Sequence, residues 1–406
     1  MKTMLYCEPI RKIQKIEAHK PWKRLPYFAI YDRDMIMCTG ETLLTYDTAT
    51  GKEATISLPK LSSDKDSKVH NNVDIDSYHG ITAVFVSKDG DFFCVCTNRK
   101  QLCLYSRSDR ALISNRTLVR AASKARFTPS NDIVVADKSG DAYLFSSIRP
   151  DENGKLILGH LSMLLDVLVT EDNRHVITTD RDEKIRVSAF PNAYNIVSYC
   201  LGHKKFVTAV AQLPRDESVL VSAGGDGTLK FWDYKNGKEL ATVAFGDKIP
   251  ADELDKLNES LKCFELTETV ETLPVKHLRI TQLDERRALL AVSLYSSRRI
   301  LVYAVSKDLE VEYLETVLVD EEPLECLLRD NELWILQDNG AKVYKRVESR
   351  FEPDSEANKK LESLNRTWSN LRNNANKQSL FPILYKRKYD NVQEYQERKK
   401  SRLGNS

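Results

Sequence analysis

Short apolar runs separated by polar turns extend along most of the chain, a pattern typical of many short β-strands. The first three runs are Tyr27–Ile30, Met35–Cys38 and Thr42–Asp47, and groups of three similar runs follow them. The last runs of these groups align on a final aromatic residue or its equivalent at Tyr46, Tyr105, Phe145, Ser188, Trp232, Tyr303 and Tyr344. Apart from two long gaps, these positions recur every 40–45 residues or so, about the length of one four-stranded blade.

The most regular part of this repeat lies between residues 158 and 233. The tripeptide Leu-Gly-His occurs twice there, with its histidines, His160 and His203, 43 residues apart. The second copy closes on Trp232-Asp233, as repeats of the WD type do. We therefore predict an all-β fold that resembles the WD repeats, a seven-bladed β-propeller over residues 27–349.

Polar segments precede and interrupt the repeat. Residues 1–26 are basic and irregular, and we treat them as a separate N-terminal segment with a candidate role in closing the ring. Two polar insertions, 57–80 and 247–274, account for the two long gaps. The second insertion carries leucines at helical spacing among acidic residues, which predicts an amphipathic helix on the rim of the propeller.

Residues 350–406 leave the strand pattern, and we predict a C-terminal tail that is first helical and then basic. Leucines and Trp368 recur at helical spacing, and a stretch rich in lysine, arginine and tyrosine follows. Such a stretch either contacts nucleic-acid phosphates and bases or is a solvated, nuclear-targeting terminus. The candidate contacts are Lys386, Arg387, Lys388, Arg398, Lys399, Lys400 and Arg402.

Each copy of the regular repeat contains a histidine, a hydroxyl residue and an aspartate. A catalytic triad has the same residue types, but a triad needs to occur only once, whereas this set occurs twice. Buried polar side chains persist when they satisfy one another's hydrogen bonds, so we predict structural networks that tie the strands of a blade together. The expected members are His203, Ser222, Asp226 and Trp232 in one blade, and His160, Thr178 and Asp182 in the preceding one.

Composition narrows the class of protein further. The 61 lysines and arginines nearly balance 59 aspartates and glutamates, leaving a net charge of +2, so only local clusters point to nucleic acid. The 8 cysteines contain no CxxC pair, and neither they nor the histidines have metal-ligand spacing, so we expect reduced thiols and no metal. Phosphate-binding loops, a signal peptide and membrane-spanning runs are not expected either.

The blade that ends near Ser188 departs from its neighbour in an informative way. Where the neighbour has Gly224-Gly225-Asp226-Gly227, this blade has Asp180-Arg181-Asp182-Glu183, followed by Lys184 and Arg186. Small turn residues are thus replaced by charges of both signs. A solvated turn is one explanation, and a partner-binding surface that uses charge pairs for specificity is the other.

Three stretches carry a resemblance to a known family: Val134–Asp141, Leu158–Val167 and Thr179–Val187. They read VVADKSGD, LGHLSMLLDV and TDRDEKIRV, which a generic WD repeat does not share. They closely resemble the non-catalytic WD-repeat subunit of the eukaryotic tRNA (guanine-N(7)-)-methyltransferase. The resemblance is strongest over residues 131–240.

The resemblance implies a heterodimer in which a separate subunit binds S-adenosylmethionine and methylates a guanosine in the tRNA variable loop. This chain would then bind no cofactor, stabilise the catalytic subunit, help to position tRNA through its basic tail, and reside in the nucleus, with the cytoplasm as a further site. The residues carried over to the partner interface are Arg186 above all, then Arg181, Glu183 and Lys184, with Lys138 and Asp166 as secondary candidates.

Two other functions fit a propeller. A general WD-repeat scaffold or ubiquitin-ligase substrate adaptor often has arginine shortly after Trp-Asp, but here Lys235 follows Trp232-Asp233-Tyr234. A propeller enzyme needs polar ligands that converge on the central channel, and the sequence shows no metal-spaced or activated-nucleophile set. Both alternatives are less consistent with the sequence than the non-catalytic subunit.

Overall fold

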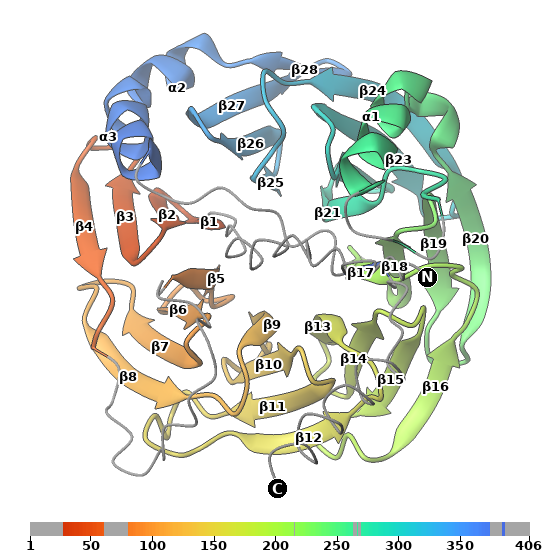
Figure 1. The fold of residues 1–406 in the computed structure, drawn as a ribbon, viewed down its shortest axis with the longest axis horizontal. Coiled ribbons are helices and arrows are strands. Elements are labelled where there is room, and N and C mark those ends of the chain that lie inside the picture. The colour runs from red at the N-terminus through yellow and green to blue at the C-terminus, as the bar shows by residue number, and fades with distance from the viewer. Residues whose placement is uncertain are drawn as a thin grey trace, which may run out of the picture.

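The computed structural model describes residues 27–60, 80–214, 216–262, 266, 269–373 and 384–385. Within these residues, seven four-stranded antiparallel sheets stand as blades around a common axis (Figure 1). The predicted seven-bladed β-propeller is therefore confirmed. The predicted third runs of the repeat are the third strands of the seven blades.

The strands of each blade follow one another in the chain. Blades 1 to 3 consist of β1 (Tyr27–Tyr31), β2 (Asp34–Thr39), β3 (Thr42–Asp47) and β4 (Glu53–Ser57); β5 (Ile81–Val86), β6 (Phe92–Thr97), β7 (Gln101–Ser106) and β8 (Leu112–Thr117); and β9 (Ala122–Phe127), β10 (Ile133–Asp137), β11 (Asp141–Phe145) and β12 (Lys155–Gly159). Blades 4 and 5 consist of β13 (Leu164–Val169), β14 (His175–Asp180), β15 (Ile185–Ala189) and β16 (Ile196–Cys200), and of β17 (Val207–Leu213), β18 (Asp216–Gly224), β19 (Thr228–Asp233) and β20 (Lys238–Ala244). Blades 6 and 7 consist of β21 (Val275–Gln282), β22 (Arg287–Leu294), β23 (Arg299–Ser306) and β24 (Val311–Leu318), and of β25 (Glu325–Arg329), β26 (Glu332–Gln337), β27 (Gly340–Val347) and β28 (Arg350–Pro353).

The middle strands of the blades hold the core. Strands β2, β6, β10 and β14 are almost entirely buried, whereas the outer strands β4, β8 and β20 are largely exposed. Apolar side chains on both faces of the middle strands pack against the neighbouring blades, which explains why those runs are more continuous than a half-exposed strand would be. The cysteines at 38, 94, 96, 103, 200 and 326 are free thiols in this core, as expected.

Direct packing of blade 1 on blade 7 and two helices close the ring, and no blade combines both ends of the described chain. Helices α2 (Ser355–Lys360) and α3 (Glu362–Asn373) lie between blade 7 and blade 1 (Figure 1). Trp368 and Leu364, both fully buried, pack in one cluster with Leu44 of blade 1 and Leu336 of blade 7. The predicted boundary at residue 349 is therefore too early, because β28 completes blade 7 and the helices belong to the propeller.

Side-chain amides of these helices also complete the edge of β27. The Asn365 amide accepts a hydrogen bond from Ala341 N (2.8 Å) and donates one to Ala341 O (3.0 Å). Asn358 makes the same pair of bonds with Val343, at 2.8 and 2.9 Å. Since β28 has only 4 residues and pairs with the later part of β27, the two amides satisfy backbone groups that a longer outer strand would otherwise pair.

The helix predicted in the second insertion is α1 (Ala251–Leu261), which follows the short 3₁₀ helix η1 (Gly246–Lys248). Leu257 and Leu261 are buried against the core of blades 5 and 6. Glu253 fixes the helix to blade 6, accepting hydrogen bonds from Ser297 Oγ (2.6 Å) and Arg299 Nε (3.0 Å). No helix in the described part of the chain is long and apolar enough to cross a membrane.

Candidate partner interface

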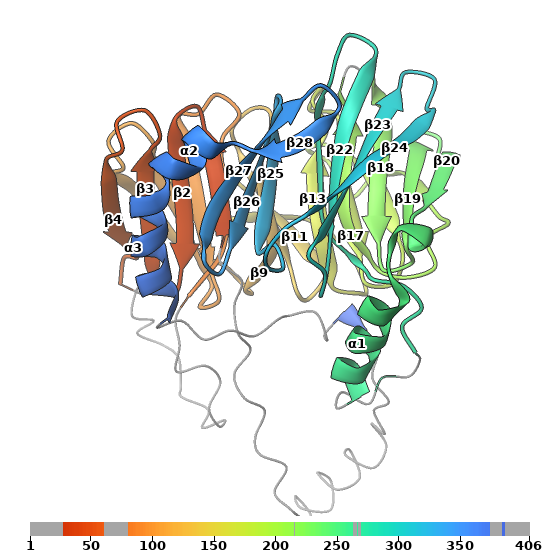
Figure 2. The same cartoon turned by 90° about the horizontal axis from the view of Figure 1, so that it is seen from above.

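One face of the propeller brings together the turns between second and third strands and the loops between successive blades. Helix α1 lies on this face, so we call it the α1 face (Figure 2). Backbone hydrogen bonds join its parts: His160 N donates to Gly140 O (2.7 Å), and Arg181 N donates to Met163 O (3.0 Å). The loop 160–163 is thereby held between the turn of blade 3 and the turn of blade 4.

The polar set of blade 5 forms the structural network that the sequence predicts. His203 Nδ1 lies 2.8 Å from Asp226 Oδ2, and His203 Nε2 lies 2.7 Å from Ser222 Oγ. Trp232 Nε1 donates to the same hydroxyl at 2.8 Å. Because a carboxylate only accepts hydrogen bonds, His203 carries a proton on Nδ1. All four side chains are committed to one another inside the blade, which leaves no free nucleophile or base.

In blade 4 the predicted carboxylate is the wrong one. His160 Nδ1 lies 2.9 Å from Asp180 Oδ2 and Nε2 lies 2.9 Å from Thr178 Oγ1, so Asp180 replaces Asp182 as the third member. The other oxygen of Asp180 accepts hydrogen bonds from the backbone N–H groups of Asp182 (2.9 Å) and Lys184 (3.0 Å). The position aligned with Asp180 in blade 5 is Gly224, which has no side chain to compete for this role.

The network of blade 5 should give the fold an acid-sensitive contribution. Burial opposes ionisation of Asp226, but hydrogen bonds from His203 and its neighbours outweigh it and lower the pKa of Asp226 from 3.8 to about 2. A lowered pKa stabilises the folded state above the unfolded pKa, and this stability, about 2 kcal/mol, is lost as the pH falls from about 4 towards 2. In urea denaturation, the difference between the wild type and Asp226→Asn should shrink over that range; a constant difference would argue against this origin.

The turn after the second strand of a blade needs one residue with a left-handed backbone. In the matching turns of blades 2 to 5, glycine takes that position in blades 3 and 5, at Gly140 (φ 103°) and Gly227 (φ 72°). In blade 4 the residue is Glu183, with φ 74°, and in blade 2 it is Lys100, with φ 63°. A side chain in this conformation costs roughly 1 kcal/mol relative to glycine. The two charged residues therefore stand where stability alone favours glycine.

Four of the six predicted interface residues lie on the α1 face. Lys138 belongs to the turn between β10 and β11 and is exposed, as is Lys184 in the turn between β14 and β15. Arg181 and Glu183 in that same turn are half-buried. Together with the intervening loop 160–163 they form one continuous surface across blades 3 and 4.

Arg186, the principal interface candidate, is instead inside blade 4. Its side chain donates to Ser188 Oγ (2.9 Å), to Gly159 O (3.1 Å) and to Ala193 O (2.9 Å), and the residue is only 8% exposed. Ser188 stands where blade 5 has Trp232, so the guanidinium fills space that a tryptophan would occupy. Arg186 therefore supports the turn and the loop at Gly159 and does not present its charge to a partner.

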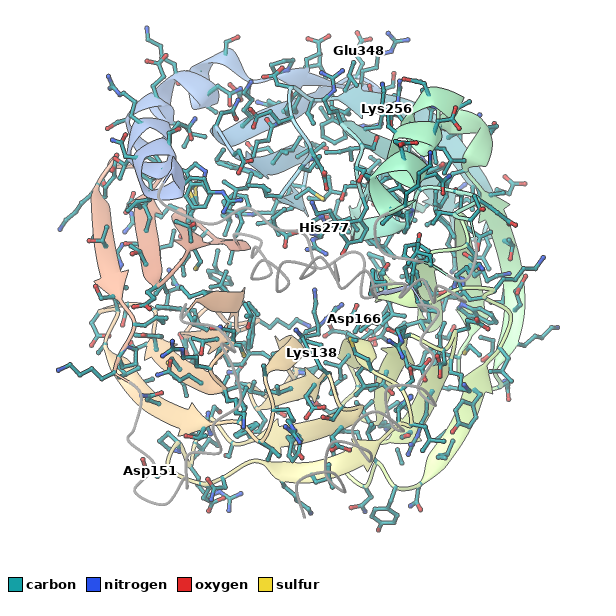
Figure 3. All side chains as sticks on the ribbon, in the orientation of Figure 1. Lys138, Asp151, Asp166, Lys256, His277 and Glu348 are labelled. Carbon is teal, nitrogen blue, oxygen red and sulfur yellow. The ribbon has the colours of Figure 1, made fainter. Side chains whose placement is uncertain are left out.

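Asp166 is also placed inside the fold, close to the propeller axis (Figure 3). Its carboxylate is paired with Arg126 (2.5 Å) and accepts a hydrogen bond from Val210 N (3.0 Å). The residue is 1% exposed, so the sequence prediction of an interface role is wrong for the described structure. It joins blades 3, 4 and 5 through their innermost strands.

Sequence reasoning missed Leu161, whose side chain is fully exposed at the centre of the surface across blades 3 and 4. It lies between the two backbone hydrogen bonds that hold the loop 160–163. A fully exposed leucine on a rigid loop beside charged residues offers apolar area that a partner protein can remove from water. Alternation of apolar and polar residues cannot reveal such an exposed loop residue. The seven tail residues predicted to contact tRNA, from Lys386 to Arg402, lie outside the described residues.

The fold and the polar network of blade 5 define the class of protein as a WD-repeat propeller. Residues 146–364 match the family model described as the tRNA methyltransferase TRM82 WD40 domain. The chain belongs to this family, the non-catalytic WD-repeat subunits of tRNA (guanine-N(7)-)-methyltransferase.

Relatives in several animals support the assignment. The non-catalytic subunit wdr4 of Xenopus laevis is 33% identical over 80% of this chain and 80% of its own length. The human subunit WDR4 is 33% identical over 78% of this chain and 75% of its own. The subunit wuho of Drosophila mojavensis is 34% identical over 80% of this chain and 81% of its own. These names support the prediction of a non-catalytic subunit.

Solved structures show the same fold at lower sequence similarity. A chain of "Crystal Structure of Mitotic Checkpoint Complex" superposes with a TM-score of 0.61 at 13% identity, covering 80% of this chain and 90% of that one. "Structure of U3-55K" superposes with a TM-score of 0.57 at 12% identity, covering 77% and 88%. At such identities the likeness concerns the fold alone.

Proposed function

We propose that this chain binds the S-adenosylmethionine-dependent catalytic subunit of the tRNA (guanine-N(7)-)-methyltransferase and holds it in its active conformation. The chain itself contributes no cofactor and no reacting group. The catalytic subunit populates its competent state more when it is bound to the propeller than when it is free. Binding therefore activates the catalytic subunit although this chain takes no part in the reaction. The complex works in the nucleus, where the basic tail, Lys386 to Arg402, helps to seat tRNA.

The observation that carries the proposal is the surface across blades 3 and 4. It combines an apolar anchor, Leu161, with the charged residues Arg181, Glu183 and Lys184 on rigid, doubly hydrogen-bonded connections. Charges of both signs, exposed at Lys184 and half-buried at Arg181 and Glu183, suit a specific protein partner better than a uniform polyanion. Glu183 keeps a left-handed backbone at a position that glycine fills in other blades, which fits selection for contact over stability.

Glu183→Gly provides a sharp test of this assignment. Glycine removes the backbone cost, so the free energy of unfolding should rise by about 0.5–1 kcal/mol. Loss of the carboxylate should at the same time weaken binding to the catalytic subunit, measured by isothermal titration calorimetry. A variant that is more stable and binds less well cannot be explained by misfolding. Unchanged affinity would remove Glu183 from the interface.

Leu161→Asp tests the apolar anchor on the same surface. The side chain touches solvent in the free chain, so folding should be unaffected. Burying a carboxylate where the leucine sat should weaken the complex by about 2 kcal/mol or more. Leu318→Asp is the matched control, because Leu318, at the end of β24, is 55% exposed in blade 6, away from blades 3 and 4. Equal effects of both substitutions would contradict the proposed site.

A further inference from the structure

The innermost strands of blades 6 and 7 bring three metal-ligating side chains together beside the propeller axis. His277 belongs to β21, whereas Glu325 and Cys326 belong to β25, and Figure 3 places His277 at the edge of the central opening. One ligand atom from each of these residues lies within 4.8 Å of the others. His277 and Glu325 are each 8% exposed and Cys326 is fully buried, so the cluster lies inside the fold and touches the channel only at its edge.

Ser293 and Arg279 orient this cluster in the way that supporting residues orient metal ligands. Ser293 Oγ lies 2.8 Å from His277 Nδ1, so Nε2 is the ring nitrogen that faces Glu325, 3.3 Å from its Oε1. Metal-binding histidines use their other ring nitrogen for such a hydrogen bond. Arg279 Nη2 and Cys326 N donate to Glu325 Oε1 at 2.6 and 3.0 Å. Among the described residues Glu325 Oε2 accepts no hydrogen bond, and this oxygen is the ligand atom that remains.

The ligand types of the cluster and their spacing suit zinc. Imidazole nitrogen, thiolate sulfur and carboxylate oxygen are the ligands that zinc takes in proteins, whereas Mg²⁺ and Ca²⁺ prefer oxygen alone. Ligand atoms on one tetrahedral zinc ion stand roughly 3.3–3.8 Å apart. Side-chain rotations that bring the three atoms about 1 Å closer would therefore complete the site. A fourth position would face the central channel and be filled by water.

A network of hydrogen bonds without a metal is the alternative explanation of the cluster. The set around His203 in blade 5 is such a network, and each of its side chains has a hydrogen-bond partner within the set. The cluster of blades 6 and 7 differs in two respects. It contains the thiol of Cys326, and one carboxylate oxygen of Glu325 is without a hydrogen bond from the described residues.

Neighbouring cations set an upper limit on the affinity of the site. Arg279, Lys276 and Lys124 act electrostatically on His277 and therefore oppose a divalent cation bound to it. Two of them are paired, Lys276 with Glu322 at 2.7 Å and Arg279 with Glu325 at 2.6 Å. We therefore expect zinc to bind in the micromolar range, more weakly than in a closed structural site with four protein ligands.

We propose that His277 Nε2, Glu325 Oε2 and Cys326 Sγ bind one zinc ion, which joins blade 6 to blade 7 at the propeller axis. The Cys326 thiol releases its proton to solvent when the ion binds, and His277 Nδ1 donates its proton to Ser293 Oγ. The ligands come from two blades, so the spacing of ligand pairs along the sequence does not reveal them. The site is separate from the surface across blades 3 and 4, and its test does not depend on the catalytic subunit.

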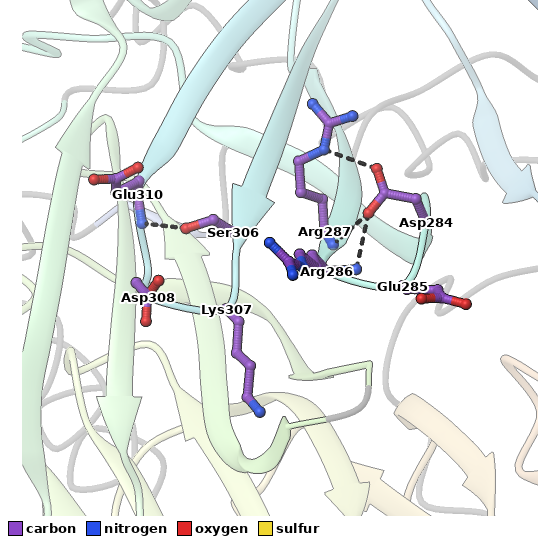
Figure 4. A pocket seen from close by; sticks show the side chains of 8 residues that line it. All are labelled: Asp284, Glu285, Arg286, Arg287, Ser306, Lys307, Asp308 and Glu310. Atoms are coloured by element: carbon purple, nitrogen blue, oxygen red, sulfur yellow. Dashed lines mark hydrogen bonds and ion pairs between the residues drawn. The ribbon is translucent and has the colours of Figure 1, made fainter.

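The pocket between the turns of blade 6 supplies a control for weak cation binding at the surface (Figure 4). Asp308 and Glu310 are exposed there. Asp284 lines the same pocket, but its carboxylate accepts hydrogen bonds from Arg287 N and Arg287 Nε, both at 2.8 Å. Asp308→Asn combined with Glu310→Gln therefore removes the exposed carboxylates of the pocket and leaves the cluster of blades 6 and 7 unchanged.

Cobalt(II) is the probe for the thiolate ligand, because a thiolate bound to cobalt gives a charge-transfer absorption band that nitrogen and oxygen ligands do not give. The full chain, purified without an affinity tag and freed of metal with a chelator, should show this band with added Co²⁺ and lose it when Zn²⁺ is added. Cys326→Ser should lack the band. Cys200→Ser is the matched control, since Cys200 is another buried free thiol, and it should keep the band. A wild type without the band, or a band that survives in Cys326→Ser, would overturn the proposal.

Thermal unfolding with and without zinc tests the other two ligands. Zinc should raise the unfolding midpoint of the wild type by about 2 °C or more, and by much less in His277→Asn, Glu325→Gln and Cys326→Ser. The double variant at Asp308 and Glu310 should respond as the wild type does. Each variant is compared with its own metal-free form, so a change in its intrinsic stability does not affect the result. Equal shifts in the wild type and in all three ligand variants would show adventitious surface binding and contradict the site.

Discussion

Trp368→Ala should open the seam between the first and last blades and lower the free energy of unfolding by about 3–5 kcal/mol. Trp368 is completely buried among residues of blades 1 and 7, and its Nε1 donates to Gln337 O at 3.1 Å. Each blade takes its strands from one continuous stretch of chain, so no shared strand joins the two ends, and helix α3 adds its contacts to the direct packing of blade 1 on blade 7. Chemical denaturation followed by intrinsic fluorescence measures the change.

Arg366→Ala is the matched control for Trp368, because Arg366 is exposed on the same helix. Its effect should stay within about 0.5 kcal/mol. A truncation after Pro353 removes both helices and should destabilise the ring at least as much as Trp368→Ala. If the truncated chain unfolds at the same denaturant concentration as the full chain, the helices do not close the ring.

Arg186→Leu should destabilise blade 4 and, through it, the partner surface. The substitution leaves Ala193 O and Gly159 O without their donor, and we expect the free energy of unfolding to fall by about 2–4 kcal/mol. Burial lowers the pKa of Arg186, but a guanidinium remains charged at neutral pH. Binding to the catalytic subunit should weaken because the loop bearing Leu161 begins next to Gly159.

Lys184→Glu distinguishes this indirect effect from direct contact. Lys184 is exposed in the adjacent turn, so its reversal should weaken partner binding while the unfolding midpoint stays unchanged. Arg186→Leu should weaken partner binding and also lower the unfolding midpoint. The sequence alone favours Arg186 as a direct contact with an intact fold. That interpretation would be restored if Arg186→Leu abolished binding at unchanged stability.

The fold could be predicted from the sequence because its repeat is local. Each blade is one continuous stretch, so a period of apolar runs and turns suffices to count the blades. The spacing of Leu254, Leu257 and Leu261 likewise predicts α1, since a helix places such residues on one side. The network around His203 follows from residue types that recur at matching positions.

The remaining features depend on distances between side chains in the folded protein, which the spacing of residues along the sequence does not give. Asp180 and Asp182 lie in the same turn, and only the backbone path decides which one reaches His160. The sequence suggests that Arg186 is a surface charge, whereas in the structure its side chain donates to three acceptors inside the blade. The helical spacing around Trp368 predicts a helix but not its position between the first and last blades. The hydrogen bond from Tyr46 Oη of blade 1 to Lys360 O of α2 joins residues 314 positions apart in the chain.

The most direct test of the account is a tRNA methylation assay with three samples: this chain alone, the catalytic subunit alone, and an equimolar mixture of the two. Transfer of a labelled methyl group to guanine N7 is measured with an S-adenosylmethionine donor. We expect no transfer by this chain alone, weak transfer by the catalytic subunit alone, and a rate well above both for the mixture. Transfer by this chain alone, or a mixture no faster than the catalytic subunit, would contradict the account.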